Sequence, residues 1–297
     1  MPKVYAMDKV AAIVVTYRPD IDAIEKSVRS ISNNGADVII VDNSEQKTHF
    51  PDMAATVLSL GDNLGIAEAQ NIGIKKAIDL GYEWLIFFDQ DSIIEDGFLG
   101  QLMKNACDDV PYVAAPVFYD NEKGFYYYLL DVDDNGRRTK IYPQNIANGL
   151  KISTVISSGM LINKRALDVV GHMRSDLFID YVDTEWCLRA ASKGVKIEIM
   201  KDAVMKHSIG DRSISLFGYK VPVHGYQRRY YRVRNAFLLL RMKHVPKRLA
   251  IREIIFSFVH QVVIILNGKN KWRYMKCYAL AVFDGVLGRS GKCRHSI

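Results

Sequence analysis

Continuous apolar runs alternate with stretches of helical periodicity through the first 120 residues. The run at 10–17 is typical of a buried strand, and Ile21, Ile24, Val28 and Ile31 then share one helical face. The alternation continues with strands expected at 37–44, 55–63, 84–89 and 112–120, and helices expected at 65–81 and 96–109. Because these strands are apolar throughout, the pattern predicts a mostly parallel sheet with helices on both faces.

The pattern changes after residue 120. Residues 121–152 are polar and aromatic and contain Asn135-Gly136, a hairpin turn signal, which predicts a β-rich insertion. Three further segments are expected. Residues 155–167 form a strand followed by a helix, residues 178–194 a loop and a helix, and residues 195–210 a strand, a turn and a second strand. We therefore expect one α/β domain over residues 1–224 and a helical C-terminal region over 225–297.

The C-terminal region contains the most apolar segment of the chain. Residues 254–266 are apolar except for Ser257, His260 and Gln261. That run is too short and too interrupted for a transmembrane helix, which needs about 20 apolar residues. Two interpretations stay open: an amphipathic helix at a membrane surface, or an ordinary helix packed on the domain or on a second subunit of a homo-oligomer.

Charge divides the chain into two unlike parts. The formal net charge of +7 conceals +16 over residues 201–297, which carry 20 Lys and Arg against 4 Asp and Glu, and −9 over the first 200 residues. So basic a region favours an anionic partner: phosphates, nucleic acid or an anionic membrane. The sequence shows no signal-peptide pattern, and its four cysteines lack metal-site or disulfide spacing, so we expect a cytoplasmic protein.

Polar side chains follow three of the expected strands, as Thr16-Tyr17-Arg18, Asp42-Asn43-Ser44 and Asp89-Gln90-Asp91. Ligands of parallel sheets lie outside the carboxyl ends of the strands, so these groups predict a site. Asp89 and Asp91 face the same side of the chain, where two carboxylates repel unless a cation lies beside them. They suit Mg²⁺ or Mn²⁺ that also holds a phosphate, and a solvated turn is the simpler alternative.

A second acidic group lies near the start of the helix expected after residue 182. Asp183, with Asp180 and Glu185 close by, is either a helix cap or a base kept ionised by the helix N-terminus. Trp186 is either a core residue or a platform for a sugar ring. His207, at the end of a strand pattern, is either structural or a metal ligand.

The order of motifs resembles a known family. The sequence contains, in turn, VVTYRP, VDNS, DNLGIAEAQNIGI, FFDQDSII, SSGMLI, FIDYVDTEWCLRAASKG and KHSIG. This order resembles glycosyltransferase family 2, the inverting sugar-nucleotide transferases with the GT-A fold, and in particular the bacterial rhamnosyltransferases of O-antigen and capsule assembly. The resemblance covers residues 8–240. It implies a Rossmann-like, mostly parallel α/β sheet, and the rest of the basic helical region carries no motif of the family.

The resemblance implies roles for the residues on the donor side. Asp42 would hydrogen-bond the pyrimidine base, and Asn63 would approach the nucleoside. Asp89 and Asp91 would contact the ribose and the metal-bound diphosphate, with His207 completing the metal shell. The other residues that would line the nucleotide pocket are Thr16, Tyr17 and Arg18.

The resemblance also implies the catalytic group. Asp183 matches the family's base, which takes the proton of the acceptor hydroxyl as that hydroxyl attacks and inverts the anomeric carbon. Val182 stands where the family usually has Glu, and Asp180 is a competing base. Apart from the family motifs, four arginines of the basic stretch 226–235 are expected to contact diphosphate, either of the donor or of a polyprenyl-diphosphate acceptor: Arg228, Arg229, Arg232 and Arg234.

The resulting hypothesis is a transferase that moves L-rhamnose from dTDP-L-rhamnose to a hydroxyl of a lipid-linked glycan, with Mg²⁺ or Mn²⁺, at the inner face of the cell membrane. Transfer of another sugar, such as galactofuranose or glucose, is the alternative. A D-x-D phosphatase of the haloacid-dehalogenase type is disfavoured because Ile93 replaces the expected Thr or Val. A non-enzymatic basic module leaves the strand-tip carboxylates unexplained. Interleaved Arg and aromatic residues also bind single-stranded nucleic acid, but no accompanying motif supports such a partner.

Overall fold

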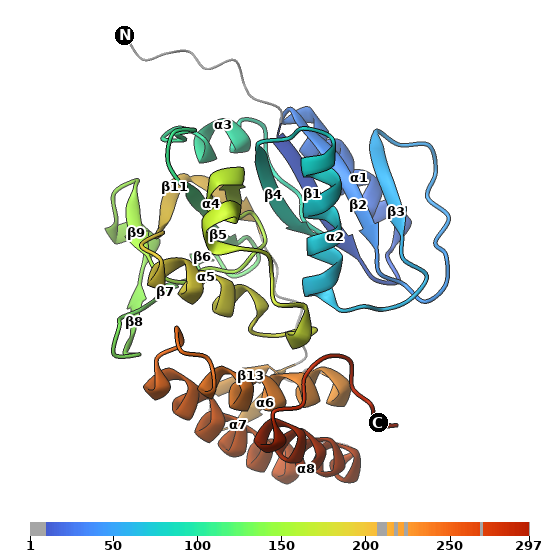
Figure 1. Ribbon diagram of the computed structural model, residues 1–297, viewed down its shortest axis with the longest axis vertical. Coiled ribbons are helices and arrows are strands. Elements are labelled where there is room, and N and C mark those ends of the chain that lie inside the picture. Colours follow the sequence, from blue (N-terminus) through green and yellow to red (C-terminus); the bar gives the residue numbers. More distant parts are fainter. Residues whose placement is uncertain (1–9, 207–212, 217–218, 223–224, 268–269, 297) are drawn as a thin grey trace.

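The computed structural model describes residues 10–206, 213–216, 219–222, 225–267 and 270–296. Figure 1 shows an α/β body that holds the sheet and, below it, a layer of three C-terminal helices. His207, predicted as a metal ligand or structural residue, lies outside the described residues, as does the end of the strand predicted before it.

A nine-stranded mixed sheet forms the centre of the α/β body. Eight strands run in the order β3-β2-β1-β4-β10-β5-β11-β9, and β6 pairs with β5. Strands β3, β2, β1 and β4 are parallel, as are β5 and β11, whereas β10 is antiparallel to both β4 and β5. The bounds are β1 Val10–Thr16, β2 Ala36–Asp42, β3 Ala55–Ser59, β4 Trp84–Asp89, β5 Val113–Asp120, β6 Phe125–Tyr126, β9 Leu150–Ile152, β10 Leu161–Asn163 and β11 Ile197–Lys206.

Two hairpins lie outside this sheet. Strand β7 (Leu129–Val132) pairs with β8 (Arg138–Ile141), and β12 (Ser213–Leu216) pairs with β13 (Tyr219–Pro222). The segment 121–152, predicted to be β-rich, contains β6, β7, β8 and β9. The β7–β8 hairpin turns at the Asn-Gly pair read from the sequence, and Gly136 there has a φ of +78°, which suits glycine.

Strand side chains alternate between two apolar clusters, one on each face of the sheet. In β1, Ala11 and Ile13 belong to one cluster, and Val10, Ala12 and Val14 to the other. Helices α2, α4 and α5 contribute to the first cluster and α1 and α3 to the second, so both faces are covered (Figure 1). The prediction of a mostly parallel sheet flanked by helices is confirmed. The bounds are α1 Ile21–Asn33, α2 Ile66–Asp79, α3 Phe98–Leu102, α4 Lys164–Val170 and α5 Val182–Ser192, with 3-10 turns η1 Pro143–Asn145 and η2 Ser175–Leu177.

The helix predicted at 96–109 is much shorter in the structure. It ends as α3 at Leu102, and the backbone that follows turns to tertiary partners. The carbonyl oxygens of Cys107 and Val110 accept hydrogen bonds from the side-chain amide of Asn163, at 3.1 and 2.8 Å. These carbonyls therefore anchor β10 instead of extending the helix.

The strand, turn and strand predicted at 195–210 form a single strand over the described part. This strand, β11, runs through Lys206 beside β5, and its register shifts between Ile199 and Val204. A bulge of this kind accommodates extra residues without ending the strand. The polar residues Lys201 and Asp202, which resemble a turn in the sequence, lie within this irregular stretch.

Three helices form the C-terminal layer: α6 Tyr226–Leu240, α7 Lys247–Asn267 and α8 Lys271–Leu287. Both α7 and α8 pack on α6, and α7 also contacts α8. The expectation that the apolar segment is too short to cross a membrane was wrong on length. By length and composition alone, the helix over residues 247–266 is long and apolar enough to cross a membrane. An 18-residue window within it has a mean hydropathy of 1.9, and one third of that window is buried inside the molecule.

Candidate active site

A cleft of about 890 Å³ lies between the carboxyl end of β4 and the C-terminal helices. Asp89 and Asp91 line it from the end of β4, and Asp183 lines it from the start of α5. Arg228 and Arg232 line it from α6. The structure thus brings the strand-tip carboxylates, the predicted base and two of the four predicted arginines into one cavity.

The turn after β4 holds Asp89 and Asp91 at the wall of this cleft. The backbone N–H of Asp89 donates to Ser92 Oγ at 3.1 Å, and Ser92 Oγ lies 3.2 Å from Ser158 Oγ. Asp89 is partly buried and Asp91 is exposed. Among the described residues, no three His, Cys, Asp or Glu side chains gather as a complete metal-ligand set. Two carboxylates facing a cleft nevertheless fit a hard cation, which commonly takes its remaining ligands from substrate phosphates and water.

Asp183 lies in the first turn of α5, which directly follows a strained segment. Phe178, Asp180 and Tyr181 have φ values of +68°, +65° and +63°, although none of them is glycine. Such conformations each cost about 1–3 kcal/mol and persist where the surroundings enforce them. The helix cap is Tyr181, which makes no side-chain cap bond, so Asp183 is not the helix N-cap considered from the sequence.

Asn235 of α6 holds this segment in place. Its side-chain amide donates to the carbonyl oxygens of Leu177, Ile179 and Asp180 at 2.9, 2.8 and 2.9 Å. Arg234 adds a bond from Nη2 to Leu177 O at 3.0 Å. Both side chains are almost fully buried. Sequence reasoning missed Asn235 and assigned Arg234 to a diphosphate, because it treated this stretch as a basic surface. The available signal was a polar pair set between apolar Val233 and Ala236.

The two candidate bases have different electrostatic surroundings. Burial raises the pKa of Asp183, and the carboxylates of Asp180 and Asp89 raise it further, whereas the backbone N–H of Thr184, donating at 2.7 Å, opposes this. Asp180 instead pairs with Arg228 at 3.4 Å and with Arg232 at 3.8 Å. Asp183 has no such ion pair with any described residue. The two carboxylates therefore differ in what holds them: two arginines pair with Asp180, and none of the described residues forms an ion pair with Asp183.

The residues predicted to bind the nucleotide form a separate cluster beside the cleft. Thr16 Oγ1 and Ser44 Oγ donate to Asp42 Oδ1 at 3.3 and 2.7 Å, and the Arg18 N–H donates to Ser44 Oγ at 2.8 Å. Asp42 is almost fully buried, so in this structure it organises the loop after β2. Its other oxygen, Oδ2, accepts one bond, from Thr48 N–H.

Gln90 links this cluster to the turn after β4. Its side-chain oxygen accepts the Tyr17 N–H at 2.8 Å, so the loops after β1 and β4 lie side by side. On the other flank, Asn43 Nδ2 donates to Asn63 Oδ1 at 3.1 Å. One edge of the sheet, next to Asp89 and Asp91, therefore brings together all the residues predicted to bind the nucleotide: Thr16, Tyr17, Arg18, Asp42 and Asn63.

Two predicted contact residues face away from the cleft. Trp186 has no exposed surface, and its indole N–H donates to Gly171 O at 2.8 Å, so it is a core residue and not a sugar platform. Arg229 is 3% exposed and bonds His260 Nδ1 at 3.0 Å and the carbonyl of Ser257. Burial lowers the pKa of Arg229 to about 10. It joins α6 to α7 and is not available to a diphosphate.

Comparison with known proteins places the chain in a family. Residues 11–171 match the family model described as Glycosyl transferase family 2. The chain is 42% identical over 289 residues to the dTDP-rhamnosyl transferase RfbF of Shigella flexneri, covering 96% of this chain and 98% of RfbF. The chain belongs to glycosyl transferase family 2. The predicted family and the prediction of a glycosyltransferase are confirmed.

Solved structures share the fold of this family 2 chain at low sequence identity. GalNAc-T7 with UDP, GalNAc and Mn²⁺ superposes with a TM-score of 0.57 and 12% identity, over 88% of this chain and 58% of that one. TarS residues 1–349 of S. aureus superpose with a TM-score of 0.55 and 15% identity, over 94% and 81%. The family 2 model ends at residue 171, so it includes the Asp89–Asp91 turn, while Asp183 lies beyond it.

Proposed function

We propose that this protein is an inverting rhamnosyltransferase that moves L-rhamnose from dTDP-L-rhamnose to a hydroxyl of a lipid-linked glycan in bacterial surface polysaccharide synthesis. The observation that carries the proposal is 42% identity, over nearly the whole chain, to a dTDP-rhamnosyl transferase. The shared cleft of Asp89, Asp91 and Asp183 supplies the chemistry that such a transfer needs.

Asp183 is the proposed general base. It accepts the proton of the acceptor hydroxyl while the hydroxyl oxygen bonds to the anomeric carbon of rhamnose. The bond from that carbon to the diphosphate oxygen breaks, and its electron pair leaves with dTDP. The raised pKa of Asp183 suits this role, because a carboxylate with a higher pKa takes a proton more readily. Attack from the face opposite the leaving group inverts the anomeric centre.

The departing dTDP carries growing negative charge that the cleft has to balance. Asp89 and Asp91 are the residues that would hold Mg²⁺ or Mn²⁺, and such an ion would neutralise charge on the diphosphate. Arg228 and Arg232 face the same cleft and are themselves held by Asp180. His207 remains a candidate ligand from the sequence.

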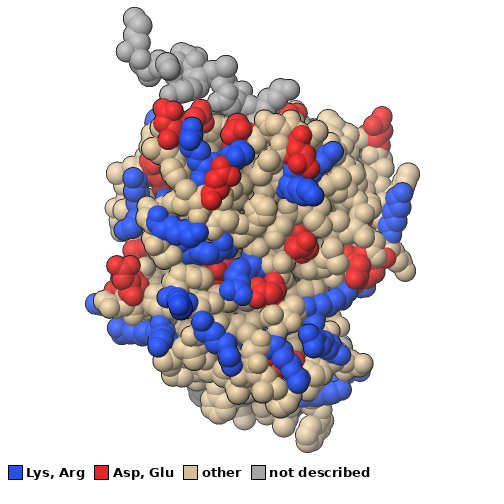
Figure 2. All heavy atoms as spheres, in the orientation of Figure 1, with Lys and Arg blue, Asp and Glu red and all other residues tan. Residues whose placement is uncertain are grey.

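The C-terminal helices are the proposed contact with the inner face of the membrane. Figure 2 shows Lys and Arg spread over the lower part of the molecule, where Figure 1 places these helices. Large apolar side chains are exposed beside them, with Phe258 at 59% and Trp272 at 80%. Apolar residues flanked by cations are typical of helices that lie in the interface of an anionic bilayer. A lipid-linked acceptor would be met there.

A donor screen tests the proposal. Purified protein with Mg²⁺ or Mn²⁺ and a prenyl-diphosphate-linked glycan is offered dTDP-L-rhamnose, UDP-glucose or UDP-galactofuranose, and the acceptor mass is followed. We expect the mass of one rhamnose to be added only from dTDP-L-rhamnose, with inversion visible by NMR of the product. Faster transfer from either UDP-sugar would refute the assigned donor.

A further inference from the structure

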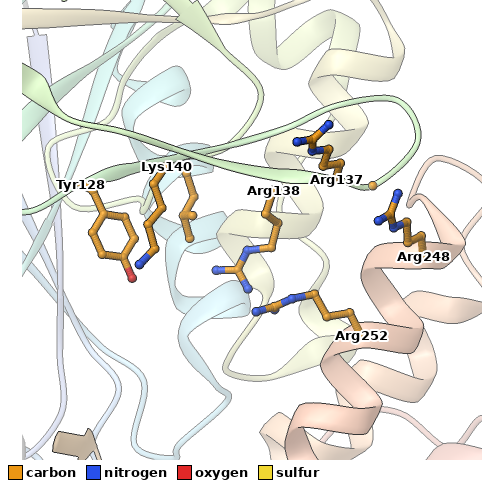
Figure 3. Close-up of a pocket in the computed structure, with 8 residues that line it drawn as sticks. Tyr128, Arg137, Arg138, Lys140, Arg248 and Arg252 are labelled. Atoms are coloured by element: carbon orange, nitrogen blue, oxygen red, sulfur yellow. The ribbon is translucent and has the colours of Figure 1, made fainter. Parts of the chain in front are cut away.

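A second cavity, of about 430 Å³, lies between the β7–β8 hairpin and the first turns of α7 (Figure 3). We call it the hairpin–α7 pocket. Among the residues that the structure describes, no acidic side chain lines it and five cationic side chains do: Arg137, Arg138 and Lys140 from the hairpin, and Arg248 and Arg252 from α7. Like charges gathered in a concave site repel one another and raise the local concentration of anions.

The turn of the hairpin packs closely against the start of α7. A Cβ atom at Gly136 would lie 2.8 Å from the backbone nitrogen of Leu249 and 2.9 Å from Pro246 Cβ. The hairpin turn therefore touches the start of α7 directly, and only glycine permits that approach. Two segments that are more than a hundred residues apart in the sequence thus place their cations around one cavity.

The five cations differ in how far they are already neutralised. Arg138 and Arg252 both bond Glu253 Oε1, at 3.0 and 2.5 Å, and in Figure 3 their head groups point toward each other. Lys140 lies over the Tyr128 ring at 4.3 Å. Arg137 and Arg248 are exposed and make no ion pair with any described residue. At least two guanidinium groups are therefore ready to bind an anion.

The start of α7 adds to the positive potential of the pocket. Helix N-termini carry a partial positive charge and favour anions. The first turn of α7 contains no acidic residue, and its first two residues are Lys247 and Arg248. Nothing in this turn offsets the charge of the pocket.

The position of the pocket indicates which anion it suits. Leu130 and Arg138 line both this pocket and the active-site cleft, so the two cavities adjoin. In the other direction Arg252 stacks on Phe256 at 4.1 Å, which begins an exposed apolar stripe along α7. A ligand here has an anionic centre, with an apolar portion on one side and a portion that enters the cleft on the other.

We propose that the hairpin–α7 pocket binds the diphosphate of the lipid-linked acceptor. The prenyl chain leaves along the exposed stripe of α7, and the glycan enters the cleft past Arg138 toward Asp183. This inference rests on the proposed function, because it takes the acceptor to be a prenyl-diphosphate glycan. Arg137 and Arg248, and not Arg229, are then the contacts of this diphosphate, because Arg229 is buried between α6 and α7.

Binding is tested with a double variant, R137A/R248A. These two side chains lack ion pairs with described residues, so removing them breaks no ion pair, whereas removal of Arg138 or Arg252 would break one of the two pairs with Glu253. The matched control is K26A/K75A, which removes two exposed cations from α1 and α2. The probes are farnesyl diphosphate, inorganic pyrophosphate, dTDP and phosphatidylglycerol vesicles, each titrated against the full-length protein.

We expect R137A/R248A to raise the Kd for farnesyl diphosphate by about tenfold or more, since two charge-assisted contacts are lost, and K26A/K75A to leave it unchanged. The affinity for dTDP should not change. An unchanged Kd for farnesyl diphosphate in R137A/R248A would overturn the proposal. So would an equal loss of dTDP affinity, or a loss confined to vesicle binding, because these outcomes assign the cations to the donor or to membrane headgroups. Pyrophosphate binding that weakens while farnesyl diphosphate binding does not would overturn it as well.

Steady-state kinetics separate this inference from the proposed function. With the prenyl-diphosphate glycan, R137A/R248A should raise KM about tenfold with kcat unchanged, whereas the same glycan on an uncharged octyl group should show no difference from wild type. Equal KM changes for both acceptors would refute a diphosphate contact. If the wild type transfers no rhamnose at all, the proposed function fails, while the farnesyl diphosphate titrations still decide the pocket.

Discussion

Asp180 and Asp183 are three residues apart, yet their surroundings give them different chemistry. Asp180 is held by Arg228 and Arg232, whereas burial and the charges of Asp180 and Asp89 raise the pKa of Asp183. These surroundings support our proposal of Asp183 as the base, which the departure from the family pattern at Val182 had left uncertain in the sequence.

The first prediction concerns the base itself. Asp183→Asn keeps the size of the side chain but cannot accept the proton, so kcat should fall by about 10²–10⁴-fold. The Kd for dTDP, measured by calorimetry, should stay at the wild-type value because the nucleotide residues are elsewhere. Near wild-type turnover in D183N would move the role of base to Asp180.

The second prediction concerns pH. Because Asp183 must be ionised to act, kcat should fall on the acidic side as pH drops through its raised pKa. The charge of Asp180 raises that pKa, so Asp180→Asn should lower it and move the acidic limb of the kcat–pH profile to lower pH. Asp79→Asn, an exposed carboxylate outside the cleft, should leave the limb in place. A limb that moves to higher pH in D180N would contradict this account.

At the scale of elements, the sequence predicts most of the strands and helices because their periodicity is local. It misses that β10, three residues long, inserts antiparallel between β4 and β5, since the pairing of so short a strand is set by its neighbours. The same limit applies to the site. Asp89, Asp91 and Asp183 were identified by type and position, but Trp186 and Arg229 were assigned to the wrong surface.

Those two errors have one physical cause. A helical pattern gives the angle between side chains, but not which side of the helix the rest of the molecule covers. Trp186 turns to Gly171 in the core, and Arg229 turns to α7. Asn235 shows the opposite error, a contact that the sequence did not lead us to expect. Its side-chain amide donates to the carbonyl oxygen of Ile179, which is far away in the sequence.

The third prediction tests Asn235 as a positioning residue. Asn235→Ala removes the bonds that hold the strained segment before Asp183, and should lower kcat by up to about 10²-fold through misplacement of the base. Asn71→Ala is the matched control, because Asn71 bonds the backbone of Met173 outside the cleft at 2.9 Å. Both variants should lose about 1–3 kcal/mol of unfolding free energy by denaturant titration. Equal activity in the two variants would reduce Asn235 to a structural role.

At the scale of the whole molecule, the C-terminal helices present an apolar surface to solvent. The exposed large apolar residues there are Ile251, Ile255, Phe256, Phe258, Val259, Val262, Leu266, Trp272, Met275, Phe283, Val286 and Leu287. These residues lie on α7 and α8, which are in contact, and exposed apolar side chains gathered in this way favour an interaction site. The cations around it favour an anionic bilayer over a second copy of the chain, which carries the same charge.

The fourth prediction addresses that surface. Phe258→Ser with Trp272→Ser should reduce co-sedimentation with phosphatidylglycerol vesicles, because two exposed apolar anchors are lost. Transfer to a soluble acceptor should be unaffected. Leu80→Ser with Val110→Ser, exposed apolar residues on the α/β body, should bind vesicles like wild type. Unchanged vesicle binding together with a shift from dimer to monomer in ultracentrifugation would assign the surface to a second subunit instead.

The three hydrogen bonds from Asn235 to the carbonyl oxygens of Leu177, Ile179 and Asp180 also matter when parts of such proteins are exchanged. A designer who exchanges C-terminal regions between relatives, to redirect one enzyme to another's acceptor, would naturally cut near residue 225. That junction would separate the amide of Asn235 from the three carbonyls that it holds. Functional hybrids should instead inherit residues 177–181 and α6 from the same parent, so that the side chain of Asn235 and the carbonyl oxygens it bonds stay matched.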